Sequence, residues 1–197
     1  MRHLRSAALA GLLLCISAGV TGAEEARYRF EWQGGGGYVM RGGMSFDAAL
    51  QDDGVVTGSD LTCFFIEGSR NGDPVGRWAL SMLNEETSWM LTFLPQSSEF
   101  AVFGEGTPMP QAWNMNGVGN DCGAGGFGFN IGNAAQDLCI DGTLIFESQV
   151  PPGRPFPAMR DDSLSFPSDA CQAPMLMSAL SEDRIYPLYQ KDETDVQ

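Results

Sequence analysis

Apolar and polar residues alternate with a period of two on both sides of four consecutive glycines, residues 34–37. Successive side chains of an extended chain point to opposite faces, so this alternation predicts two strands with one buried face. Seven large side chains share that face: Tyr28, Phe30, Trp32, Tyr38, Met40, Met44 and Phe46. Residues 27–47 therefore predict a hairpin on which the rest of the chain can build a sheet.

Short apolar segments separated by turn residues continue as far as residue 149, and no convincing amphipathic helix interrupts them. Asp141-Gly142 is typical of a two-residue type I′ hairpin turn. About nine short strands with regularly spaced turns predict an all-β fold, an antiparallel β-sandwich or barrel.

The hairpin around Asn71 and Gly72 has two candidate registers. A two-residue Asn-Gly turn would place Ile66 opposite Arg77, whereas a three-residue loop would place Phe64 opposite Trp78. We favour the three-residue loop, because it keeps apolar residues together on one face.

The chain divides into four predicted parts. Residues 1–23 have basic residues, a short apolar run and small residues at the end, which is typical of a secretory signal peptide. Residues 24–149 form the β domain, and residues 150–190 form a proline-rich extension packed on it, with one short helix at 173–183. Residues 191–197 form a disordered acidic tail. The expected location is secreted or periplasmic, without membrane insertion.

Charge and histidine content exclude several functions. The signal peptide removes two of 11 basic residues and leaves all 25 acidic ones, so the mature surface should repel nucleic acid. His3, the only histidine, leaves with it. Ser/His/Asp triads, Cys/His pairs and histidine zinc sites are therefore excluded. The only lysine is Lys191, in the acidic tail.

Four cysteines remain after residue 23, an even number in a chain with an export signal. Two disulfides are expected, and three pairings are open. We favour Cys122 with Cys139, which are close in sequence, and Cys63 with Cys171.

Residues 49–60 partly resemble a calcium-binding loop of the EF-hand or dockerin type. Asp53, Gly54, Val56 and Asp60 match loop positions five, six, eight and twelve, and the ligands would be Asp53, Val55, Thr57 and Asp60. Positions one and three carry Ala49 and Gln51 instead of carboxylates. The alternative, which we favour, is a turn that needs no cofactor and whose aspartates face water or cap the next element.

Residues 104–126 form a long glycine-rich stretch without a clear strand pattern, and long loops often carry function. An aromatic ring with amide and carboxylate neighbours can bind a sugar, and this stretch offers Trp113, Asn114, Asn116, Asn120 and Asp121. The alternative, which we favour, is that Trp113 is a core residue that closes one end of the sandwich.

Scattered carboxylates are the remaining catalytic candidates, because a glycoside hydrolase needs two of them across a cleft. They are Glu67, Glu85, Glu86, Glu99, Glu105, Asp121 and Glu147. Most exposed carboxylates on a sheet only face water, and the sequence selects no pair among these.

Several aromatic and glycine motifs resemble a domain of exported bacterial proteins, many of which carry a PEP-CTERM sorting tail. The motifs are Phe30-Glu31-Trp32, residues 37–42, Ser45-Phe46-Asp47, residues 53–56, residues 59–61, residues 65–68, residues 111–114 and residues 141–145. The resemblance spans roughly residues 28–149 and implies an exported β domain without known catalytic residues. The chain differs in ending with Asp192-Glu193-Thr194-Asp195, where the sorting tail has a Pro-Glu-Pro motif.

The sequence thus favours a secreted, disulfide-stabilised protein that is non-catalytic and binds a glycan or another component of the cell envelope. A carboxylate-dependent enzyme acting on polysaccharides is the alternative from another class, and a structural matrix protein is the third. A deep cleft with two carboxylates would favour the enzyme, and a shallow aromatic platform would favour the binding protein. Neither feature would favour the structural protein.

Overall fold

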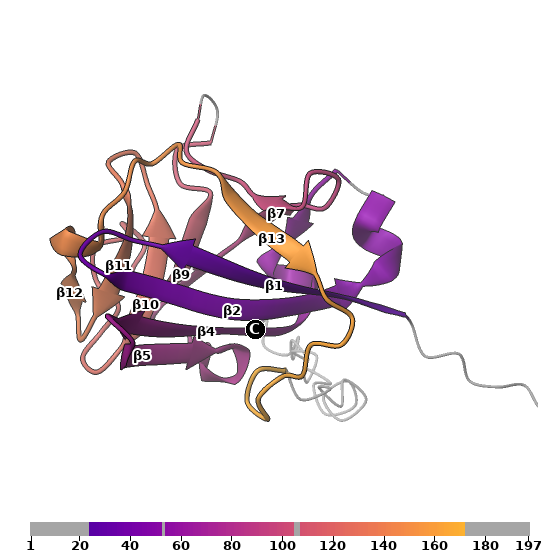
Figure 1. The fold of residues 1–197 in the computed structure, drawn as a ribbon, viewed down its shortest axis with the longest axis horizontal. Helices are drawn as coiled ribbons and strands as arrows, with labels where there is room; N and C mark the ends of the chain where they lie inside the picture. Colours follow the sequence, from indigo (N-terminus) through magenta and orange to yellow (C-terminus); the bar gives the residue numbers. More distant parts are fainter. Residues whose placement is uncertain (1–23, 53, 105–106, 172–197) are drawn as a thin grey trace, which may run out of the picture.

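The computed structural model describes residues 24–52, 54–104 and 107–171, which form two antiparallel sheets (Figure 1). The larger sheet has eight strands, in the order β3 (Val56–Thr57), β7 (Thr92–Leu94), β8 (Glu99–Phe100), β13 (Phe156–Arg160), β1 (Glu25–Gln33), β2 (Tyr38–Asp47), β4 (Leu61–Arg70) and β5 (Asp73–Ala79). The smaller sheet has five strands, in the order β12 (Thr143–Leu144), β11 (Gln136–Ile140), β10 (Phe127–Ile131), β9 (Gln111–Met115) and β6 (Ser88–Met90).

The helical segments of the described residues are short 3-10 turns: η1 (Ala48–Asp52), η2 (Gly58–Asp60), η3 (Leu80–Met82) and η4 (Phe146–Ser148). The all-β prediction is confirmed, and the described residues form 13 strands where about nine were expected. The predicted signal peptide, the helix at 173–183 and the tail at 191–197 lie outside the described residues.

The hairpin of β1 and β2 has the predicted alternation. Its strands pair from Glu25 with Asp47 to Gln33 with Val39, and all seven large side chains of the predicted face are buried. Gly36 and Gly37 have positive φ angles of 58° and 80°, which glycine adopts without strain. The four glycines therefore serve as the turn of this hairpin.

Aromatic rings from the two sheets meet in the core between them. The rings of Trp32 and Phe129 are 5.2 Å apart, and those of Phe64 and Trp113 are 5.0 Å apart, both in edge-to-face contact. This is the preferred geometry of aromatic pairs and adds to the free energy of burying their surface. The core thus joins the hairpin of the larger sheet to the centre of the smaller one.

The preferred register of the β4–β5 hairpin was wrong. Asn71 and Gly72 form a two-residue turn with φ angles of 52° and 94°, and Arg70 pairs with Asp73. A bulge next to Gly68 then shifts the pairing by one residue, so that Ile66 lies opposite Trp78. The bulge keeps the apolar residues on one face despite the short turn, a solution that neither predicted register contained.

The prediction that residues 104–126 lack a strand was also wrong. β9 lies between β10 and β6, and all five of its residues are buried. A strand that is buried on both faces shows no alternation, so its sequence does not have the period of two that marks an exposed strand.

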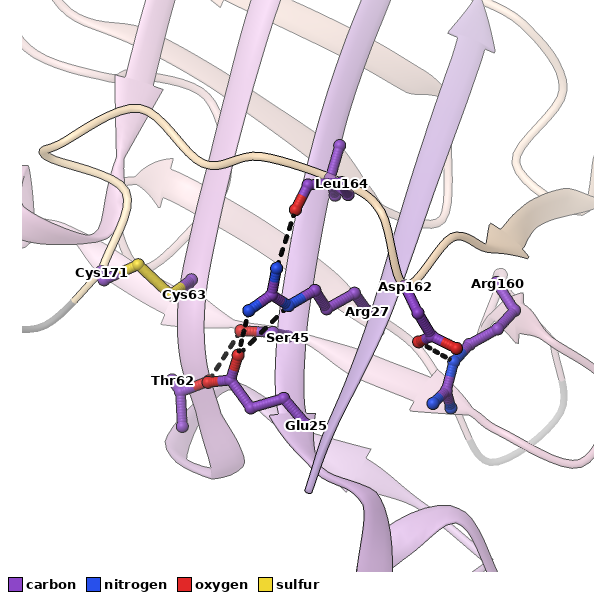
Figure 2. A network of polar contacts seen from close by, with 9 residues as sticks. All are labelled: Glu25, Arg27, Ser45, Thr62, Cys63, Arg160, Asp162, Leu164 and Cys171. Carbon is purple, nitrogen blue, oxygen red and sulfur yellow. Dashed lines mark hydrogen bonds and ion pairs between the residues drawn. A yellow bond between two sulfur atoms is a disulfide. The ribbon is translucent and has the colours of Figure 1, made fainter. Parts of the chain in front are cut away.

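The proline-rich segment contributes more than an extension packed on the surface. β13 lies beside β1 (Figure 1), with β8 on its other side. Phe156 of β13 is buried in the core. Pro157 lacks a backbone N–H but is the second residue of β13, at the end that pairs with β8. Residues 161–171, called the strap below, follow β13 and cross the outer face of the larger sheet (Figure 2).

The structure contains the two favoured disulfides, Cys122–Cys139 and Cys63–Cys171. The first lies in a small apolar cluster on the outer face of the smaller sheet, and the second ties the strap to β4. Disulfides persist in oxidising compartments, so they fit a secreted, disulfide-stabilised protein. Within the described ranges, no helix is long and apolar enough to cross a membrane.

The buried carboxylate of Asp137 makes the stability of the protein depend on pH. Asp137 accepts hydrogen bonds from Asn130 Nδ2 and, at 2.9 Å, from Gln149 Nε2. Burial raises the pKa of Asp137, and these two hydrogen bonds only partly oppose it. The pKa of Asp137 is therefore higher in the folded than in the unfolded protein. Its protonation stabilises the folded state, and this contribution to the free energy of unfolding is fully present below the unfolded pKa.

We therefore expect that contribution to be lost as the pH rises through the folded pKa. The stability of Asp137→Asn relative to the wild type should therefore increase as the pH rises above about 4, the ordinary pKa of an aspartate. Urea unfolding at a series of pH values measures this difference, with Asp121→Asn on an exposed turn as the control. A difference that stays constant or falls with pH would contradict the expectation.

Candidate binding site on the outer face of the larger sheet

Two of the residues proposed to bind a sugar are buried structural residues. Trp113 is fully buried, and its Nε1 donates to Gln111 Oε1 at 3.1 Å. Asn114 has a φ of 53°, and its Nδ2 donates to the Phe127 carbonyl at 2.9 Å. Trp113 therefore presents no ring face to solvent in this structure, as the core alternative expected.

The other three form a separate turn after β9. Asn116 Nδ2 donates to Asn120 Oδ1 at 2.6 Å, and the Asn116 N–H donates to the Asp121 carbonyl at 2.6 Å. Asp121 Oδ1 in turn accepts from the Gly123 N–H at 2.8 Å. These polar groups hydrogen-bond within the turn, and the structure does not bring them together with the ring of Trp113.

The calcium-loop candidate includes a capping interaction. Asp60 Oδ2 accepts hydrogen bonds from the Thr57 N–H at 2.7 Å and from Thr57 Oγ1 at 2.6 Å, which closes η2. Val55 is exposed, and Asp53 lies outside the described residues. In the part of the chain that the structure describes, no three His, Cys, Asp or Glu side chains are grouped so that they could hold a metal ion.

A row of charged residues crosses the outer face of the larger sheet. Glu31 on β1 pairs with Arg41 on β2, Arg41 with Glu67 on β4, and Glu67 with Arg77 on β5. All four side chains are exposed, because each occupies the position opposite to the buried face of its strand. We call this arrangement the charge row.

The ion pairs of the charge row leave Glu67 without a close cation. Glu31 pairs with Arg41 at 2.7 Å, and Arg77 makes two hydrogen bonds to Asp169 of the strap at 2.7 and 2.9 Å. Among the described residues, Glu67 has no cation within 4.0 Å. Its carboxylate therefore lies between two guanidinium groups that are bound to other acids.

The same contacts explain the pKa shifts at both ends of the row. The hydrogen bond from Gln33 at 2.9 Å, followed by the interaction with Arg41, holds the pKa of Glu31 below its usual value. The hydrogen bonds from Arg77 lower the pKa of Asp169 in the same way. Both carboxylates are thus stabilised as hydrogen-bond acceptors with a negative charge.

Two adjacent depressions lie on either side of Glu67. The first, of about 420 Å³, is lined by three members of the charge row, Arg41, Glu67 and Arg77, together with Pro74. The second, of about 430 Å³, lies towards β13 and includes Phe65 and Met159. Arg41 and Glu67 line both depressions, so the two form one groove that combines charged groups with apolar surface.

The strap forms one side of this groove. Leu164, which lines the second depression, packs on Gly43, where an added Cβ would approach its Cδ2 to 2.6 Å. Figure 2 shows Arg27 pointing towards the strap, with Nη1 donating to the Leu164 carbonyl at 3.1 Å. The disulfide Cys63–Cys171 and the Arg77–Asp169 pair hold the far end of the strap. The wall of the groove is therefore fixed at several points.

Glu67 was among the scattered carboxylates considered as catalytic candidates, but the charge row was not predicted. The alternation in residues 27–47 leaves Glu31 and Arg41 on the face opposite to the predicted buried side chains. The alignment of the charge row across four strands depends on the register, including the β4–β5 bulge that the preferred prediction lacked.

Comparison with protein-family models, curated proteins and solved structures finds no match to this chain. The resemblance to the exported bacterial domain therefore stays a prediction, and the outer face of the larger sheet is the basis for proposing a function.

Proposed function

We propose that this protein is an exported, non-catalytic binding protein whose groove around Glu67 binds an uncharged carbohydrate. The observation that carries this proposal is the charge row, in which carboxylates alternate with guanidinium groups along a groove. A carboxylate only accepts hydrogen bonds and a guanidinium only donates them. A sugar hydroxyl does both, so alternating groups can satisfy neighbouring hydroxyls of one ring.

The remaining properties of the groove agree with this ligand. Phe65 and Pro74 supply apolar surface against which the C–H groups of a sugar can pack. The chain has a net charge of −14, which disfavours an anionic ligand.

A polysaccharide-active enzyme is less well supported. The general acid of a glycoside hydrolase needs a raised pKa. The pKa of Glu31, the other carboxylate of the charge row, is lowered by its hydrogen bonds. A purely structural protein would not bind a free glycan at this groove, so binding separates that function from the one proposed.

A glycan array followed by titration calorimetry tests the proposal with Glu67→Gln. This change removes the charge but nearly keeps the size of the side chain, and Glu67 has no ion pair to lose among the described residues. Because a hydrogen bond to a charged group contributes about 1.5–3 kcal/mol, we expect a loss in affinity of about tenfold or more.

Glu85→Gln is the matched control, because Glu85 is an exposed glutamate that does not line either depression. Its variant should bind like the wild type. The proposal fails if no neutral glycan binds the wild type, or if both variants bind with unchanged affinity.

A further inference from the structure

A third depression continues the groove beyond β1. It has a volume of about 310 Å³, and its lining includes Gln33, Arg154 and Pro155. It shares Glu31 and Pro157 with the second depression, as the second shares Arg41 and Glu67 with the first. The three depressions therefore follow one another and form a continuous track.

The track runs across the strands. It passes over β5, β4, β2, β1 and β13, which are neighbours in that order in the larger sheet. Adjacent strands lie about 4.8 Å apart, so the four steps span about 19 Å. Several sugar units in a row fit this length, whereas a single unit would fill only one depression.

Donors and acceptors alternate over the whole length of the track. Arg154 extends the charge row at the β13 end, so the order is Arg77, Glu67, Arg41, Glu31 and Arg154. Arg154 Nη1 donates to the Gln33 carbonyl at 2.5 Å, which holds the guanidinium at this end. The chemistry that suits one sugar ring is thus repeated along the track.

The strap shows that a chain can pack across these strands. It contacts Arg29 on β1 through Asp161, Gly43 on β2 through Leu164, and Arg77 on β5 through Asp169. The strap therefore crosses strands of the larger sheet (Figure 2), and its Leu164 lines the second depression of the track. The first depression lies over β5, which is an edge strand of the sheet, so a bound polymer could continue past that end.

We propose that the ligand is a linear, uncharged polysaccharide that lies across the strands and occupies all three depressions at once. This inference rests on the function proposed above and adds the length and direction of the ligand. An extended peptide fits less well, because peptides that bind sheets usually add along a strand edge and hydrogen-bond through their backbone. The track instead presents side chains and crosses the strands.

The test measures affinity against ligand length. Linear gluco-, xylo- and manno-oligosaccharides of one to six units are the probes, and calorimetry gives the dissociation constants. We expect the affinity to rise by about tenfold or more from the disaccharide to the tetrasaccharide and then to level off, since about 19 Å of track is then filled.

Arg154→Gln tests the far end of the track. It should weaken tetrasaccharide binding by about fivefold to tenfold and leave disaccharide binding nearly unchanged, because it removes one charged donor outside the central groove. Arg70→Gln is the matched control. Like Arg154, Arg70 is exposed and donates a hydrogen bond to a backbone carbonyl, and it pairs in addition with Glu147, but it does not line the track. Thermal melts of both variants confirm that they fold.

The possible failures are distinct. If all lengths bind equally, or if Arg154→Gln has no effect on the tetrasaccharide, the extended ligand is overturned while the carbohydrate-binding function stands. If the array gives no neutral glycan at all, or if only oligopeptides bind, the proposed function itself is overturned.

Discussion

Trp113→Ala is expected to lower the free energy of unfolding by about 3–5 kcal/mol. The side chain is fully buried in the middle of the core. Its ring lies 5.0 Å from Phe64 and 4.9 Å from Phe129, so it bridges the two sheets. Alanine would leave a cavity between rings that are anchored on different strands and cannot easily close it.

Urea unfolding followed by circular dichroism measures this loss. Phe146→Ala is the control, because that side chain is 74% exposed and its removal should change stability by no more than about 0.5 kcal/mol. Trp113→Phe should lie between the two, since it keeps an aromatic ring but removes the hydrogen bond to Gln111. A Trp113→Ala protein of normal stability would show that the ring does not join the sheets.

The same variant separates the two interpretations of Trp113. If the ring were a platform for sugars, alanine would abolish binding without affecting the fold. We expect the opposite: the folded fraction of Trp113→Ala should retain binding at the groove around Glu67, which lies on the outer face of the other sheet.

The sequence predicted those strands that have one face in the core and the other exposed to solvent. In β1 and β2 the exposed charges alternate with buried aromatic residues, so periodicity alone identified both strands and their buried side chains. The turn at Asp141 and Gly142 was also predicted correctly. Asp-Gly favours a type I′ turn, in which both residues have positive φ angles, and the angles here are 49° and 70°.

The parts that the sequence did not predict depend on tertiary context. β9 is buried on both faces, and β13 contains Pro157, so neither has the local pattern of an exposed strand. The β4–β5 bulge was missed for another reason. The ring of Phe127, which belongs to the other sheet, packs on Gly68 and Gly76. A Cβ atom added at either glycine would lie only 2.4 or 2.5 Å from this ring.

The candidate site also depends on tertiary context, so the sequence alone did not predict it. The alternation within a strand is a local pattern, but the charge row exists only when four strands are in register. The strap, which is distant in sequence from β1, forms the wall of the groove through contacts such as that of Asp161 with Arg29. Such a site is a property of strand pairing, and no local motif identifies it.

Removal of the Cys63–Cys171 disulfide should destabilise the protein more than removal of Cys122–Cys139. A cross-link limits the conformations of the unfolded chain, and the limit grows with the length of the closed loop. The sequence separations are 108 and 17 residues. The expected losses are about 5 kcal/mol for Cys63→Ala/Cys171→Ala and about 3 kcal/mol for Cys122→Ala/Cys139→Ala.

Guanidinium chloride unfolding of the two double variants measures both losses. The denaturant dependence of the free energy should also rise more for Cys63→Ala/Cys171→Ala, because its unfolded chain expands more and exposes more surface. If that variant is too unstable to purify, the order of the two losses is obtained by partial reduction of the wild type and by comparing melting temperatures.

A larger loss for Cys122→Ala/Cys139→Ala would mean that contacts in the folded state, and not the length of the closed loop, determine the cost of removing a disulfide. Cys122 and Cys139 are both buried in the apolar cluster on the smaller sheet, so their replacement could leave a cavity there. The strap, in contrast, keeps the exposed Arg77–Asp169 pair, which contributes little to stability. The order of the two losses therefore decides whether the Cys63–Cys171 disulfide acts mainly on the unfolded chain or mainly as one more contact that holds the wall of the groove.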